Sequence, residues 1–201
     1  MELWNEAIVY YQEAMNAIEE DKAIELYDKA ISCLLLAAEQ EKSEKNRLIL
    51  SLNALQAESN KYTVLANMLK DVAYQLQGND AAKCLTDAAN YHLFSNHSRK
   101  EAAEIAKKID DMAAYYNLLG GAYQDKAFYH SYLALASQKI NNLDSAKKDY
   151  KKALELLEIS LEHYNKSLNI KFNPETENNR LQCLKYLENF RADITTISPS
   201  V

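Results

Sequence analysis

One spacing recurs along this chain: a small residue, a tyrosine four positions later, and a second small residue three positions after that. It occurs as Ala-x3-Tyr-x2-Ala in segments 7–14, 23–30 and 146–153. Residues separated by four and by three positions share one face of an α-helix. Alanines on that face let a neighbouring helix approach closely, and the tyrosine fills the space beside them. The spacing therefore predicts helical hairpins packed against one another.

The scarcity of helix-breaking residues supports the same architecture. Only 3 of the 201 residues are Gly and 2 are Pro. In average chains these residues make up about 7% and about 5% of the composition. Both prolines, Pro174 and Pro199, lie near the C-terminus, so no earlier helix has to end at a proline. We expect an all-α protein of about seven to eight helices in antiparallel hairpins, with a single domain over residues 1–194 and a flexible tail at 195–201.

Polar turns divide the predicted helices. We place the N-cap of a second helix at Asp21, a C-terminal glycine stop at Gly78, and a loop at 95–98 in which Ser98 caps the following helix. Two adjacent glycines are costly inside a helix, so Gly120-Gly121 predicts either a kink or the close approach of another helix. The predicted helices are about 3–19, 22–41, 44–77, 80–95, 99–140 (interrupted at the glycines), 143–170 and 175–193.

A heptad pattern runs through residues 48–76. Apolar positions step by four and three without a slip, with Ser59 as the polar member. This pattern is typical of a coiled-coil seam. Two interpretations remain open: the seam packs against neighbouring helices of the same chain, which we favour, or it pairs with a second copy to form a homodimer.

Charge and composition argue against several classes of partner. The formal net charge is −6 and the lysines are scattered among glutamates, whereas phosphate-binding surfaces need clustered cations. We therefore expect no nucleic-acid partner and no direct membrane insertion. Because the N-terminus lacks a signal-peptide pattern and the three cysteines are widely separated, we expect a cytoplasmic protein.

The residue patterns of common active sites are missing from the sequence. It has no phosphate-binding glycine loop, no Glu-x-x-His pairs of the di-iron kind, and four histidines without ligand spacing. We accordingly predict no catalytic residues, no cofactor and no metal, and a protein that is not an enzyme.

Residues 131–156 resemble the tetratricopeptide repeat (TPR). Leu133 and Ala134 fall where that family has Leu-Gly, Asn141 falls at the turn, and the 146–153 spacing falls on the packing positions of the second helix. The resemblance implies TPR-like hairpins over 79–194 that bind other proteins. Some members of the family bind the acidic C-terminus of a partner through lysine and asparagine side chains. Ser131 and Leu135 stand at those positions here, so the resemblance does not support a carboxylate ligand. An amphipathic helix is the more compatible ligand.

Residues 2–70 are similar to the microtubule-interacting-and-transport (MIT) domain, a three-helix bundle. The segment 62–70, Tyr-x2-Leu-Ala-x2-Leu-Lys, lies close to that family's Tyr-x2-Arg-Ala-x2-Leu-Lys, with Leu65 in place of the arginine. The resemblance implies an MIT-like part over 2–77 whose third helix borders a groove for a partner helix. The groove residues it implies are Tyr62, Leu65, Ala66 and Leu69.

Aromatic residues are densest around the two glycines. Aromatic side chains fill space between helices, and they are also enriched at recognition surfaces. If this region contains a cleft, it is where we expect a partner to bind. The candidate binding residues there are Tyr116, Tyr123, Phe128 and Tyr132.

These observations favour a non-enzymatic interaction module or adaptor that binds a peptide or helix in a groove between helices. Two alternatives stay open. One is an MIT-like adaptor for membrane-remodelling filament proteins, and the other is a self-associating structural subunit.

Overall fold

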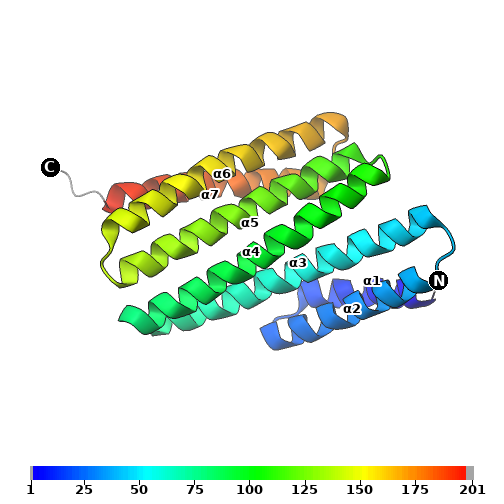
Figure 1. The fold of residues 1–201 in the computed structure, drawn as a ribbon, viewed down its shortest axis with the longest axis horizontal. Coiled ribbons are helices and arrows are strands. Elements are labelled where there is room, and N and C mark those ends of the chain that lie inside the picture. The colour runs from blue at the N-terminus through cyan, green and yellow to red at the C-terminus, as the bar shows by residue number, and fades with distance from the viewer. Residues whose placement is uncertain (1, 198–201) are drawn as a thin grey trace.

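The computed structural model describes residues 2–197, which form helices joined by short turns (Figure 1). Within these residues there are seven helices and no strands. The prediction of an all-α stack of antiparallel helices is confirmed. The helices are α1 (Glu2–Asn16), α2 (Glu20–Gln40), α3 (Glu44–Gln75), α4 (Gly78–Lys108), α5 (Met112–Lys139), α6 (Leu143–Ile170) and α7 (Pro174–Ile197).

Each helix packs mainly against its neighbours in the chain. The pair α1–α2 lies at one side of the stack, α6–α7 at the other, and α3, α4 and α5 lie between them (Figure 1). The α5 and α7 helices also touch. All six alanines of the recurring Ala-x3-Tyr-x2-Ala spacing are buried, as are Tyr27 and Tyr150. The spacing therefore marks the faces on which the hairpins pack, as predicted.

The predicted loop at 95–98 is wrong, because α4 continues through it to Lys108. Ser95 and Ser98 are buried and donate hydrogen bonds to carboxylates on other helices, Ser95 to Asp125 and Ser98 to Glu58. Ser95 and Ser98 resemble turn and cap residues in the sequence, whereas in the structure they connect α4 to neighbouring helices. The chain instead turns before α5, where Asp110 has a φ of 63° and the Asp111 carboxylate accepts a hydrogen bond from the Ala114 N–H.

The α5 helix runs through Gly120 and Gly121 without interruption. Of the two predicted outcomes, a kink or a close approach, the structure has the close approach, since α6 lies against Gly120. A Cβ atom on Gly120 would lie 2.7 Å from the ring of Tyr164 on α6. The Gly120 carbonyl accepts a hydrogen bond of 2.7 Å from the Ser160 hydroxyl. Only a residue without a side chain allows α6 to lie this close.

Several predicted helix ends also need correction. Asp21 lies in the first turn of α2, and Glu19 is at the N-cap without a side-chain hydrogen bond. The α7 helix runs to Ile197, whose side chain is buried, so residues 195–197 of the expected tail are helical. Residues 198–201 lie outside the described residues. Gly78 has a φ of +58°, a conformation that favours glycine. It is the first residue of α4, whereas the C-cap of α3 is Leu76, so the predicted glycine stop lies two positions too late.

The heptad seam of α3 packs within the chain. Ser59 is fully buried, and its hydroxyl lies 2.7 Å from that of Ser95 on α4. Leu52 of α3 packs against Ala102 and Ala103 of α4. The α4 helix therefore occupies the face of α3 on which a homodimer through this seam would depend.

No helix of residues 2–197 combines the length and the apolar character needed to cross a bilayer.

The contact at Gly120 gives a stability prediction. We expect Gly120→Ala to lower the free energy of unfolding by about 1–3 kcal/mol, because the new methyl group meets a buried ring that cannot move aside. Gly121→Ala should also lower stability, since its Cβ would lie 2.9 Å from Nη1 of Arg99, whose guanidinium is held by Asp125. Urea denaturation of both variants measures the loss. A Gly120→Ala protein as stable as the wild type, as helix propensity alone would favour, would contradict this contact.

Candidate functional site

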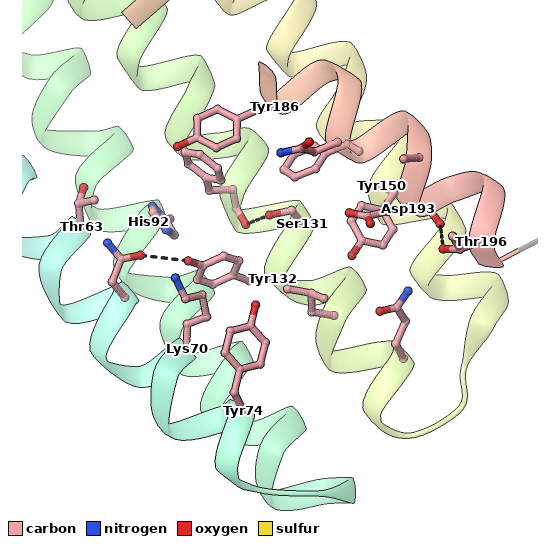
Figure 2. A pocket seen from close by; sticks show the side chains of 17 residues that line it. Thr63, Lys70, Tyr74, His92, Ser131, Tyr132, Tyr150, Tyr186, Asp193 and Thr196 are labelled. Carbon is pink, nitrogen blue, oxygen red and sulfur yellow. Dashed lines mark hydrogen bonds between the residues drawn. The ribbon is translucent and has the colours of Figure 1, made fainter. Parts of the chain in front are cut away.

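A groove of about 660 Å³ opens between α3, α5 and α7, and Figure 2 shows the side chains that line it. Tyr132 lies in its middle, with Lys70 and Tyr74 on one side and Tyr150 and Asp193 on the other. This volume is in the range of known ligand sites, about 300–1,000 Å³. The groove brings together segments separated by more than a hundred positions in the sequence. We call it the α3–α5–α7 groove.

The floor of the groove is aromatic. Phe128 meets Tyr186 edge-on, with ring centroids 4.8 Å apart, and Phe190 lies 5.8 Å from Tyr150. Tyr132 is buried, and its hydroxyl donates a hydrogen bond of 3.4 Å to the Asn67 side-chain oxygen on α3. Burial raises the pKa of the Tyr132 phenol above its usual range, so the floor is uncharged at neutral pH.

The two walls carry polar side chains at helical spacing. On α3 they are Thr63, Asn67 and Lys70, and on α7 they are Asn189, Asp193 and Thr196. Steps of four and three place each set on one helical face. The groove thus has an ammonium group on one wall and a carboxylate on the other.

The charged groups of the two walls differ in how well they are paired. Lys70 lies 3.7 Å from the exposed carboxylate of Asp71, the next residue in the chain. Asp193 forms no ion pair with any basic side chain of residues 2–197, and partial burial raises the pKa of its carboxyl. A cation brought into the groove would find an available carboxylate there.

His92 of α4 lines the groove and lacks hydrogen-bond partners. Its side chain is 2% exposed, and neither ring nitrogen has a hydrogen-bond partner among the described residues. The rings of Phe128 and Tyr132 lie about 5 Å away. A buried polar group without a partner costs about 1–3 kcal/mol. Buried polar groups in proteins almost always have a hydrogen-bond partner in the protein or in ordered water.

A buried polar network lies beside His92. The Asp125 carboxylate of α5 accepts hydrogen bonds from Arg99 (2.8 Å) and from Ser95 (2.7 Å), both on α4. Its other oxygen lies 3.7 Å from Nδ1 of His92. Ser95 also meets Ser59 of α3. The network ties three helices together directly behind the groove.

The predicted aromatic residues fall into two groups. Phe128 and Tyr132 line the α3–α5–α7 groove. Tyr116 and Tyr123 instead both stack with His163 of α6, with ring centroids 6.0 Å and 5.2 Å from that of the imidazole. Burial, helped by the nearby charge of Lys166, lowers the pKa of this imidazole. The structure therefore does not bring all four residues into one site.

The four residues implied by the MIT resemblance lie along α3 near α4. Tyr62 lies 5.5 Å from the half-exposed Phe94 of α4, and Leu65 is partly buried. Ala66 has no exposed surface, because it lies in a cluster with Ala88 and Ala89 of α4, and Leu69 packs on the same cluster. The fourth helix covers the part of α3 that would face a partner helix in a free three-helix domain.

Sequence reasoning missed the polar members of the groove. His92, Asn67 and Asp193 carry no motif and lie far apart in the chain. One signal was present for α3, since the Thr63-x3-Asn67-x2-Lys70 spacing places three polar residues on one face of a helix that is otherwise largely covered. Nothing in the sequence pairs that face with α7.

Among residues 2–197, no group of three or more His, Cys, Asp or Glu side chains is arranged to hold a metal ion. The groove offers aromatic faces, hydroxyl groups, amides, one ammonium and one carboxylate. Such a surface can bind an extended or helical segment of mixed polar and apolar character.

Comparisons with known proteins give little beyond this geometry. No family model matches the chain, and no curated protein matches it significantly. A crystal structure of a de novo designed helical repeat protein is similar, with a TM-score of 0.34 and 15% sequence identity, over 98% of this chain and 94% of that chain.

The buried carboxylate behind the groove gives a second prediction. Asp125→Ala should lower the free energy of unfolding by about 3–5 kcal/mol, because it leaves Arg99 without its buried partner. The double variant Asp125→Ala/Arg99→Met should recover part of that loss. Urea denaturation compares them with Asp28→Ala, which removes an exposed pair with Lys61 and should cost less than about 1 kcal/mol. Equal losses for Asp28→Ala and Asp125→Ala would rule out a stabilising role for this network.

His163 gives a prediction for pH dependence. Its pKa is lower in the folded protein than the ordinary 6.5, so the unfolded chain binds more protons as the pH falls below that value. Stability is therefore complete above about pH 6.5 and declines toward the lower folded pKa. In urea denaturation at about pH 7.5 and about pH 5.5, we expect His163→Phe to lose less stability on acidification than the wild type.

The control for this experiment is Asn165→Ser, which changes an exposed residue that carries no titratable group on the same helix as His163. This variant should keep the wild-type dependence on pH. An unchanged pH dependence in His163→Phe would show that the stacked imidazole does not contribute.

Proposed function

We propose that this protein is a non-enzymatic interaction module that binds a peptide or helix of a partner protein in the α3–α5–α7 groove. The observation that carries the proposal is the groove itself, whose aromatic floor includes Phe128 and Tyr132. The sequence had selected both as candidate binding residues. Within this proposal the hairpins act as TPR-like units, and the protein works as a cytoplasmic adaptor.

The character of the groove favours a peptide over a flat protein surface. Its walls are two helices with polar residues at matching intervals, and its floor is aromatic. A segment lying along the groove would bury apolar side chains on the floor and leave polar groups to meet the walls. The same helices form the stable stack, so the site is present before the partner arrives, which lowers the entropic cost of binding.

A peptide library displayed on phage tests the proposal. Random twelve-residue peptides are selected on the wild-type protein, and the enriched peptides are then measured against Asn189→Trp. Asn189 lines the groove on the exposed side of α7, so the indole would fill space that the peptide needs. We expect binding to weaken by at least about tenfold.

The matched control is Gln182→Trp, the same kind of substitution at an exposed position of α7 that does not line the groove. It should bind as the wild type does, and circular dichroism should show both variants fully helical. The proposal fails if no peptide is enriched, or if the enriched peptides bind both variants equally.

A further inference from the structure

We propose that the α3–α5–α7 groove selects a partner segment carrying a lysine or arginine, whose cationic group lies beside the aromatic rings of α6 and α7 and pairs with Asp193. This inference rests on the proposed function and specifies the chemistry of the partner. It commits to a basic peptide as the occupant.

Asp193 is the group to which the cation would bind. It lies on the α7 wall and lines the groove (Figure 2). No basic side chain of residues 2–197 forms an ion pair with it, although Arg180 and Arg191 of the same helix pair with Glu177 and Glu158. The carboxylate of Asp193 is therefore available to a ligand.

Aromatic rings lie along the groove near this carboxylate. Phe190 lies 5.8 Å from Tyr150 and 6.4 Å from Tyr186, measured between ring centroids, and all three line the groove. Lysine and arginine cations are attracted to aromatic faces within about 6 Å, most strongly where water is excluded. Rings and a carboxylate together favour a cation over a neutral side chain of the same length.

His92 is a second polar group that lines the groove. The Asp125 carboxylate lies 3.7 Å from its Nδ1, and neither ring nitrogen has a hydrogen-bond partner among the described residues. A polar group of the bound segment that reached this ring would provide one.

The opposite wall orients the segment. Lys70 and Asn67 of α3 present an ammonium group and an amide, whose N–H groups suit carbonyl or carboxylate oxygens of the ligand. The ammonium group of Lys70 repels a cation. The basic side chain is thereby directed toward α7. The net charge of −6 also attracts a basic partner at long range.

Two peptide libraries test the inference. Both are random twelve-residue libraries, and one of them omits lysine and arginine. We expect groove-dependent peptides to be enriched from the complete library alone. In the best of them, replacing the basic residue with methionine should weaken binding about tenfold.

The change Asp193→Asn should weaken the same basic peptide by a similar factor and leave the methionine peptide unaffected. The matched control is Glu188→Gln, which removes one negative charge from an exposed position of α7 outside the groove and should keep wild-type affinity. Equal losses in Asp193→Asn and Glu188→Gln would overturn the inference, since they would indicate general charge attraction.

Failure of the inference is distinguishable from failure of the proposed function. Peptides enriched equally from the library without basic residues, and weakened by Asn189→Trp, would overturn the basic specificity and keep the groove as a binding site. If neither library yields a groove-dependent peptide, both proposals are overturned.

Discussion

The buried carboxylate of Asp125 sets the arrangement on which the centre of the stack depends. A buried charge needs partners, and Arg99 and Ser95 of α4 provide them. Those hydrogen bonds fix how α4 lies along α5, and the contact between Ser95 and Ser59 extends the constraint to α3. Because apolar contacts between alanine-rich helices tolerate sliding, the polar network supplies the register that packing alone leaves loose. The position of His92 at the base of the groove follows from this register.

The sequence predicts the class of fold well because its evidence is local. Alanine and tyrosine at positions 0, 4 and 7 mark the packing faces of α1, α2 and α6, and the scarcity of proline and glycine leaves long helices as the natural outcome. The two glycines at 120 and 121 predicted either a kink or the close approach of a neighbouring helix, and the close approach is what the structure has. Each of these inferences depends on residues within one or two helical turns.

Other features depend on contacts between residues far apart in the chain, and there the sequence misleads. Ser95 and Ser98 look like a turn and a cap because short polar side chains favour helix ends. They lie inside α4 because their hydroxyls reach carboxylates on other helices. The groove is a stronger case. Phe128 and Tyr132 were predicted from aromatic density, whereas His92 and Asp193 become neighbours of the same space only once α4 and α7 are stacked on α5.

The groove follows from the way the helices stack. The α4 helix packs against both α3 and α5, and α7 contacts α5. The space between α3, α5 and α7 is walled by helices that carry polar side chains, and Asn67 on one wall accepts a hydrogen bond from Tyr132. Most polar groups in the interior are satisfied, as in the Asp125 network, yet both nitrogens of His92 lack a partner and Asp193 has no ion pair with a described residue. The buried imidazole without a partner is costly for stability, whereas the carboxylate of Asp193 is partly exposed and can pair with a ligand. A ligand that pairs with Asp193 above the aromatic floor would use groups that packing leaves free, and this suits the groove to recognition.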